Sequence, residues 1–271
     1  MATNAQPSAR IRRYIPDDEK QVRFMVGQAQ MENLAYANNR AYFHPLTLAI
    51  WIAVSSVFAQ ILGSWPDPSH GFLGYLQVLP AFFTPMVPIM FFIDWKNRPT
   101  IEERAERVLR EVDLLDMGAY YARSPASGFY ILEYGDKIIG LIALDASKDS
   151  TNEIPVTGKL SDAQREQLLH GKGTSAVATI RHFFAEEAFR RTGIEEDLLE
   201  YAVRKAFEVG KEIKTIRAVA SPLRPTVRDA LRKAGFVEGD NIIKVGVMKE
   251  PLSWWMLQKS RWEASLVKKS S

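Results

Sequence analysis

One turn in the sequence has the residues needed to bind a phosphate group. Residues 188–199 read A-F-R-R-T-G-I-E-E-D-L-L, and this turn follows a β-rich run and opens a helical one. The first amides of a helix have no partner within it, and the helix dipole adds positive charge there. Gly193 permits close backbone approach, and Arg190 or Arg191 can pair with a phosphate. The turn predicts a pyrophosphate site, although Glu195 adds a carboxylate and similar helix starts also occur as simple basic loops.

The composition of the 271 residues excludes several other kinds of chemistry. There is no cysteine, so disulfides, thiolate metal sites and a catalytic thiol are excluded. Four histidines lack a metal-binding spacing such as H-E-x-x-H, and we expect no metal site; they are His44, His70, His170 and His182. The net charge of +3, with a pI near 9.0, is too small to indicate nucleic acid as a partner, and no nucleic-acid-binding motif is present.

The polar parts of the chain predict an α+β fold with a mixed central sheet flanked by helices. Apolar residues recur with the periods of strands and helices, and Gly135-Asp136 is typical of a hairpin turn. The expected elements are a strand at 10–15, a helix from Pro16 towards Met31, a helix at 101–117, strands at 128–134, 137–145 and 175–184, a helix from Gly193, a strand at 213–220, a helix at 223–234 and a strand at 241–248. Residues 146–174 are polar and predict an inserted loop with one short helix.

Two uncharged apolar runs, at 45–63 and 71–93, interrupt this domain. Each has about the 20 residues that a helix needs to cross a bilayer. Three prolines in the second run predict a kinked, shortened or re-entrant span. A hairpin buried in a soluble core is the alternative. We expect a transmembrane hairpin at 44–94, inserted between the first two helices, with the lipid bilayer as a partner.

Charges around the hairpin predict its orientation. The loop between the two runs has no lysine or arginine, whereas the flanks carry Arg40, Lys96, Arg98, Arg104 and Arg107. Positive residues stay on the cytosolic side, so both termini are expected there. The residues Lys268-Lys269-Ser270-Ser271 have the K-K-x-x form of a di-lysine retrieval signal, which predicts the endoplasmic-reticulum membrane.

We therefore divide the chain into four expected parts. They are the first strand and helix at 1–43, the hairpin at 44–94, the remainder of the domain at 95–250 and a basic aromatic tail at 251–271. The tail contains L-S-W-W-M-L-Q-K-S-R-W at 252–262. This stretch fits either a helix at the membrane interface or a last strand or helix that closes the sheet.

The sequence around the turn resembles the signature of the GCN5-related N-acetyltransferases. I-R-H-F-F-A-E-E-A-F-R-R-T-G-I-E-E-D-L-L has the family's strand, short polar link and R/Q-x-x-G-x-G/A helix start. I-R-R-Y-I-P-D-D looks like its first strand and turn, G-F-Y-I-L-E-Y-G-D-K-I-I-G-L-I-A like its second and third strands, and D-A-L-R-K-A-G-F like the end of its fourth helix. The hairpin and D-L-L-D-M-x-x-Y-Y resemble the mammalian members anchored in the endoplasmic-reticulum membrane.

The resemblance implies acetyl-coenzyme A as cosubstrate, bound on the cytosolic side. The residues implied to contact it are Phe183, Phe184, Ala185, Arg190, Arg191, Thr192, Gly193, Ile194 and Glu195. Two features depart from the family pattern. Glu195 stands where the family has Gly or Ala, and at about 4–6 Å its repulsion of a phosphate is on the order of 1–4 kcal/mol. Residues 230–236 lack the tyrosine that protonates the leaving thiolate in many members.

A general base must reach the attacking amine. The candidates are His182, Glu186 or Glu187 and Glu133, although a packed histidine and solvated glutamates are the alternatives. Two functions remain open. The first is a membrane-anchored N-acetyltransferase that acts on an amphipathic or membrane-associated amine. The second is a degenerate relative that acts as a chaperone or adaptor for a membrane-protein client, or as a subunit beside one, during export from the endoplasmic reticulum.

Overall fold

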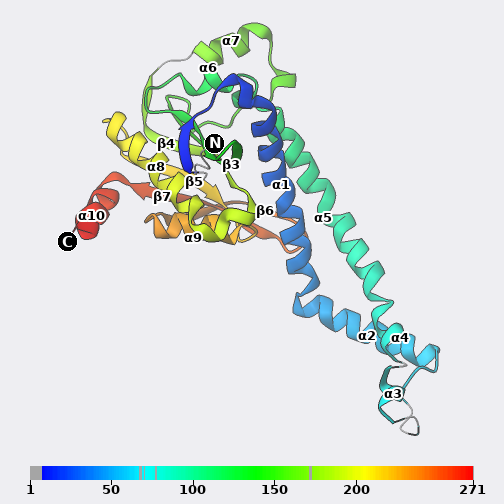
Figure 1. Cartoon of the computed structure of the whole chain (residues 1–271). Coiled ribbons are helices and arrows are strands. Elements are labelled where there is room, and N and C mark those ends of the chain that lie inside the picture. Colours follow the sequence, from blue (N-terminus) through cyan, green and yellow to red (C-terminus); the bar gives the residue numbers. More distant parts are fainter. Residues whose placement is uncertain (1–7, 67–68, 70, 77, 171–172, 271) are drawn as a thin grey trace, which may run out of the picture. The chain divides into compact units, whose positions relative to one another are not determined.

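The computed structural model describes residues 8–66, 69, 71–76, 78–170 and 173–270 (Figure 1). The chain forms two compact units. The larger unit comprises Met1–Gln30, Arg104–Lys244 and Pro251–Ser271, and the smaller comprises Met31–Glu103 and Val245–Glu250. The apolar runs fall in the smaller unit, and the predicted phosphate turn falls in the larger one.

A seven-stranded mixed sheet forms the centre of the larger unit, as the sequence predicts (Figure 1). The strands are β1 (Ala9–Arg13), β2 (Gly128–Tyr134), β3 (Lys137–Ser147), β4 (Thr174–Ala185), β5 (Thr215–Ala220), β6 (Val237–Val245) and β7 (Glu250–Gln258). Their order is β1-β2-β3-β4-β5-β7-β6. Strands β1 to β4 are antiparallel neighbours, β4 and β5 are parallel, and β5 and β7 are antiparallel.

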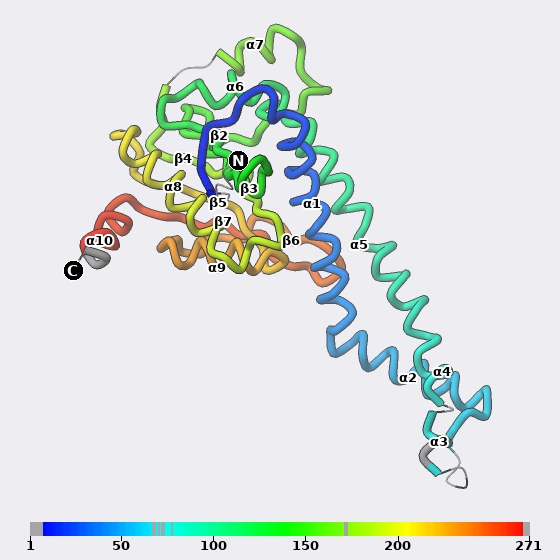
Figure 2. The backbone as a smooth tube through the Cα atoms, in the orientation of Figure 1, coloured from blue at the N-terminus to red at the C-terminus, as the bar shows by residue number. Residues whose placement is uncertain are grey.

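Helices cover both faces of this sheet. One face packs on α8 (Ile194–Val209) and α9 (Pro225–Lys233), which follow β4 and β5 along the chain (Figure 2). The predicted apolar stripe of α8 is buried there; it consists of Ile194, Leu198, Leu199, Ala202, Val203, Ala206 and Phe207. The other face packs on the first part of α1 (Glu19–Tyr42), after the short helix η1 (Pro16–Asp18), and on α6 (Met117–Tyr121). Side chains of β4 alternate between the two cores, because successive strand residues face opposite sides.

Strands β4 and β5 separate after a short pairing. Of the described residues, Val177–Ile180 of β4 pair with Thr215–Ala218 of β5. The rest of β4, up to Ala185, has β3 as its neighbour, and β5 continues beside β7. A register shift against β3 leaves Arg181 as an extra residue on β4. Because α8 and α9 start at the ends of these two parallel strands, both helix N-termini lie where the sheet separates.

The helix predicted over 101–117 is divided into three pieces, so that prediction is wrong. The helix α5 (Met86–Leu109) ends first, and the chain then forms η3 (Val112–Leu114) and α6. The cause is pairing with a distant segment. Val112 donates its backbone N–H to Pro155 at 3.0 Å, and Glu111 forms a β-bridge with Val156. The side chain of Asp116 then accepts from Ala119 N–H at 2.9 Å and starts α6.

The stretch at 252–262 is a strand followed by a helix. β7 lies between β5 and β6, and it buries Trp255 and Leu257, which favours the sheet-closing alternative for this part. The helix α10 (Lys259–Ser270) follows, and its Trp262 ring lies 5.0 Å from that of Phe207. The boundary expected at 250–251 therefore falls inside a strand. Between β3 and β4, the predicted short helix is α7 (Asp162–His170), preceded by η4 (Thr157–Lys159).

The smaller unit is helical, but it is not a simple pair of spans. It contains α2 (Pro45–Ile61), α3 (Gly71–Leu76), α4 (Val78–Phe83) and parts of α1 and α5. Trp51 and Ser55 of α2 both donate to the backbone carbonyl of Phe82, at 2.9 and 2.8 Å. Among the described residues, one helical stretch, Gly74–Leu109, is long and apolar enough to cross a membrane. Pro16–Tyr42 and Pro45–Ile61 meet this criterion as a pair, but they are bent by 59°.

Gly140 lets α8 pack closely on β3. A Cβ added at this position would lie 2.8 Å from Leu198 Cδ1 and 3.3 Å from the carbonyl oxygen of Phe184. We expect Gly140→Ala to lower the free energy of unfolding by about 1–3 kcal/mol, because α8 must shift outward. Chemical denaturation measures this, with Gly158→Ala as the control, since a Cβ there meets nothing within 4 Å. Equal effects of the two substitutions would contradict the packing described here.

Candidate active site

The predicted phosphate turn has the backbone geometry that it needs. The short helix η5 (Glu187–Thr192) leads to Gly193, whose φ of 86° lies in the left-handed region that favours glycine. The next residue starts α8, so the amides of Ile194, Glu195 and Glu196 form its N-terminal turn. A Cβ added at Gly193 would meet its nearest neighbour, the Glu196 carboxylate, at 3.9 Å. The backbone of the turn is therefore accessible to a ligand.

Two arginines near this turn bind carbonyl groups of β4. Arg190 Nε donates to the oxygen of Ala185 at 2.9 Å, and Arg224 Nη2 donates to that of Phe183 at 2.8 Å. The N–H of Glu186 bonds to a carbonyl of β3 at 2.8 Å. Since peptide groups alternate along a strand, the carbonyls of residues 183 and 185 point to the opposite edge. The arginines therefore cap the edge of β4 that β5 has left.

Glu195 points into the protein. Its residue is 2 % exposed, and Oε1 accepts a hydrogen bond from Thr226 Oγ1 of α9 at 3.1 Å. Arg190 Nε lies 3.9 Å from the same oxygen. Burial raises the pKa of Glu195, while the Thr226 hydrogen bond and the charges of Arg190 and Arg224 oppose this rise. The carboxylate is thus placed between the first turns of α8 and α9.

The other residues predicted for cofactor contact lie on three sides of the turn. Phe183 and Ala185 are buried in the core under α8 and α9, whereas Phe184 is buried in the core on the opposite face. Arg191 and Thr192 are exposed on η5. The side chains of these residues therefore lie in three different environments: the two cores and the surface.

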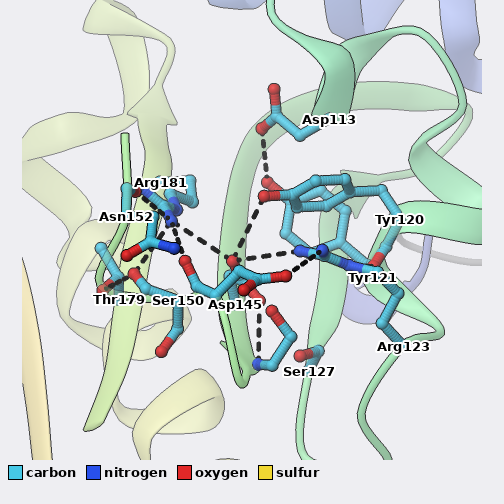
Figure 3. A network of polar contacts seen from close by, with 12 residues as sticks. Asp113, Tyr120, Tyr121, Arg123, Ser127, Asp145, Ser150, Asn152, Thr179 and Arg181 are labelled. Atoms are coloured by element: carbon cyan, nitrogen blue, oxygen red, sulfur yellow. Dashed lines mark hydrogen bonds and ion pairs between the residues drawn. The ribbon is translucent and has the colours of Figure 1, made fainter. Parts of the chain in front are cut away.

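A buried histidine–aspartate pair lies on the α6 side of β4. His182 Nε2 is 2.7 Å from Oδ2 of Asp113. Tyr121 donates its hydroxyl to the same oxygen at 2.8 Å (Figure 3). Asp113 is 0 % exposed and His182 is 6 % exposed. η3 positions Asp113, and the strand residue after the extra Arg181 positions His182. The pair is thus held rigidly next to the separation of the strands.

Charges at this pair shift three pKa values. Burial alone would lower the pKa of His182, but the Asp113 carboxylate outweighs burial and raises it. Burial would likewise raise the pKa of Asp113, but His182 and the hydrogen bonds lower it. Burial, together with the negative charge of Asp113, raises the pKa of Glu111 to about 7. Each member of the pair therefore favours the charged form of the other, relative to the isolated side chains.

A second polar network adjoins the pair and contains two arginines, Arg123 and Arg181, with two aspartates, Asp145 and Asp149. Arg181 Nη2 donates to the carbonyls of Ser150 and Asn152, both at 2.9 Å, and lies 3.4 Å from Asp145 (Figure 3). Arg123 Nη2 lies 3.5 Å from the same carboxylate of Asp145 (Figure 3). These bonds attach the loop after β3 to β4. They thereby hold this loop in place beside the polar site.

The residues of this site could also hold a divalent metal. One ligand atom each from Glu111, Asp113 and His182 lies within 4.8 Å of the other two. Asp113 Oδ1 is buried and has no hydrogen-bond partner among the described residues. One imidazole nitrogen and two carboxylates form a ligand set that Zn²⁺ accepts.

The other predicted bases do not join His182. Glu133 of β2 accepts hydrogen bonds from Arg10 and Arg12 of β1 at 2.8 and 2.6 Å, and the bond from Arg12 lowers its pKa. Glu186 pairs with Lys137 at 2.6 Å. Glu187 is exposed on η5. Of the four candidates, His182 is the one that the structure gives an acidic partner.

Sequence reasoning missed the partners of His182. Asp113 and Tyr121 lie in D-L-L-D-M-G-A-Y-Y, a segment noted for its resemblance but given no chemical role. The expected helix over 101–117 would have carried Asp113 in regular helical register. The contact with His182, 69 residues away, forms because the chain leaves the helix before Glu111. The signal in the sequence that marks Asp113 is its position as a polar residue among the apolar residues Val112, Leu114 and Leu115.

Glu111 makes the stability of the protein depend on pH. The folded state holds its proton up to pH about 7, whereas the unfolded carboxyl loses it near 4.5, so stability is lost as the pH rises between these values. At pH 8 we expect Glu111→Gln to raise the free energy of unfolding by up to about 3 kcal/mol, with no gain at pH 4. Denaturation at both pH values, with the exposed Glu153→Gln as control, measures this. A gain of equal size at pH 4 would contradict it.

Comparisons with known proteins identify the family of the chain. The chain is 26% identical over 145 residues to N-acetyltransferase 8 of Rattus norvegicus, which covers 52% of this chain and 57% of that protein. A GNAT-family acetyltransferase structure from Streptococcus pneumoniae is 11% identical, with coverage of 93% and 99% of the two chains and a TM-score of 0.46. A GNAT-family structure from Desulfovibrio desulfuricans is 12% identical, with coverage of 93% of this chain and 99% of that chain and a TM-score of 0.43. The Acetyltransferase (GNAT) family matches residues 89–236, more than half of the chain, which therefore belongs to the GNAT family.

Proposed function

We propose that this protein is a membrane-anchored N-acetyltransferase that transfers the acetyl group of acetyl-coenzyme A to an amine of an amphipathic or membrane-associated acceptor. The observation that carries this proposal is the buried pair of His182 and Asp113, next to the gap that ends at the Gly193 turn. Membership of the GNAT family supports the reaction. The rat relative's name, N-acetyltransferase 8, supports an amine as acceptor.

The turn at Gly193 fits the pyrophosphate of acetyl-coenzyme A. The amides of Ile194 and Glu196 and the dipole of α8 would bind its phosphates, with Arg190 as a cation beside them. The cosubstrate supplies the acetyl group as a thioester. The gap between β4 and β5 offers backbone N–H groups along the edge of β4, but the arginines on Phe183 and Ala185 must release the carbonyls first.

His182 is suited to accept the proton of the attacking amine. With Nε2–H donating to Asp113, Nδ1 is the nitrogen left to take a proton. Asp113 fixes this tautomer and stabilises the imidazolium that forms, and Tyr121 holds Asp113 in place. Because the amine attacks the thioester directly, no covalent protein intermediate is needed, which agrees with the absence of cysteine. Positioning supplies most of the rate, so no tyrosine acid is required.

The apolar surface of the smaller unit supports a membrane anchor. Large apolar side chains are exposed along α2 and the first half of α5; the most exposed include Leu46, Val57, Ile61, Val87 and Phe91. A soluble monomer rarely exposes so large an apolar patch. The Lys96 ammonium lies 4.9 Å from the ring of Trp95, a pairing suited to the lipid headgroup region. The expected location in the endoplasmic-reticulum membrane stays a prediction.

The alternative function, a degenerate adaptor for membrane-protein export, has its own support. The buried carboxylate of Glu195 adds negative charge beside the turn, and two arginines occupy the carbonyls of Phe183 and Ala185 on β4. In α9, Thr226 is the one residue with a hydroxyl group, and Glu195 uses it. A purified chain that retains a membrane protein and does not bind acetyl-coenzyme A would favour this alternative.

The pH dependence of acetyl transfer tests the role of the pair. Because Asp113 raises the pKa of His182, we expect the rate to rise with pH through a midpoint above 6.5. Asp113→Asn should lower the rate about 100-fold and move this midpoint to lower pH, since the imidazole loses its charged partner. Coenzyme A release with dodecylamine as acceptor measures both changes. If Asp113→Asn leaves the profile unchanged and Glu186→Gln abolishes activity, the base is Glu186.

The membrane anchor predicts that residues 64–70 lie across the bilayer from the enzyme domain. A glycosylation acceptor sequence inserted there should be modified in microsomes, because the transferase acts in the lumen. The same sequence inserted at the exposed Gly158 should stay unmodified. A gel-mobility shift reports both results. Modification at position 158, or at neither position in protein that alkaline carbonate extracts, would contradict the proposed topology.

A further inference from the structure

The carboxylate of Glu195 occupies a place that is suited to a bound anion. It belongs to the first turn of α8, and its Oε1 accepts from Thr226 in the first turn of α9. Both helix dipoles direct positive charge to this point. A negative group of the protein itself therefore stands where two helix N-termini meet.

The cations nearest to the turn also serve this carboxylate. Arg190 Nε lies 3.9 Å from it, and the charges of Arg190 and Arg224 both lower the pKa of Glu195 against the effect of burial. The same two guanidinium groups cap the β4 carbonyls of Phe183 and Ala185. One buried carboxylate and two strand carbonyls thus hold both arginines on the protein.

The next residue is different and provides a comparison within the same turn. Glu196 is half-buried on the outside of α8, and it pairs with Lys233 at 2.6 Å. Its charge is balanced by this lysine, which belongs to α9. Removing the charge at 195 or at 196 changes the net charge by the same amount, but only the first change removes the carboxylate that lies 3.9 Å from Arg190 Nε.

We propose that Glu195 sets the affinity of this protein for the pyrophosphate of acetyl-coenzyme A, by acting as an internal anion that retains Arg190 and Arg224. This inference rests on the proposed function. A pyrophosphate on the amides of α8 meets the negative charge of Glu195, and it must draw both arginines away from the carboxylate. The cosubstrate is therefore bound weakly. Glu195 affects only the binding of its phosphate end.

Calorimetric titration with two ligands tests this role. Coenzyme A carries the pyrophosphate, and pantetheine lacks it. We expect Glu195→Gln to tighten coenzyme A binding about tenfold, by removing a like charge within about 6 Å, and to leave pantetheine binding unchanged. Glu196→Gln, as the matched control, should change both affinities less than twofold. Gly193→Asp should abolish coenzyme A binding, and its titration gives the background heat.

The possible results separate this inference from the proposed function. If the unmodified protein binds coenzyme A and Glu195→Gln does not bind it more tightly, the inference is overturned and the proposed function stands. If Glu195→Gln and Glu196→Gln give equal gains, net charge explains them and the inference is also overturned. If no variant binds coenzyme A, both fail. Thermal unfolding checks that each variant is folded, and Glu195→Ala replaces Glu195→Gln if the latter is not.

Discussion

The separation of β4 from β5 is the constraint on which the candidate site depends. Two parallel strands pair over four residues each and then diverge, so the last residues of β4 lose hydrogen-bond partners on one edge. Buried carbonyls must still be satisfied. Arg190 and Arg224 donate hydrogen bonds to these carbonyls, and this places the two cations at the starts of α8 and α9. The anion-binding character of the region follows from how the sheet opens.

The two faces of β4 therefore have different functions. Towards α8 and α9, the gap offers helix amides and arginines, which suit phosphate groups. Towards α6, the same strand presents His182 to Asp113 in a dry environment, where a charge pair strongly shifts both pKa values. The extra residue Arg181 lies between the two regions and ties the loop after β3 to the strand. The two faces of one strand therefore adjoin a candidate phosphate turn and a buried charge pair.

Much of the fold could be predicted from the sequence because its signals are local. The apolar stripe of α8 and the Gly135 turn depend on spacing along the chain, and both appear as expected. The break in the helix after Leu109 could not be predicted in this way, because it depends on a hydrogen bond to Pro155, far along the chain. The inward direction of Glu195 depends on Thr226 in the same way. The sequence therefore indicated a candidate turn and strand, while the side-chain partners within the candidate site required the tertiary structure.

Hydrogen–deuterium exchange of the full chain, with and without saturating coenzyme A, tests the central claim most directly. If the gap between β4 and β5 is the cosubstrate site, binding should slow exchange at residues 183–185 and 193–196. The strand pairs of β1 and β2, on the far side of the sheet, should be unaffected. Bound coenzyme A that leaves exchange in both segments unchanged would contradict the account, because the ligand would then lie elsewhere on the protein.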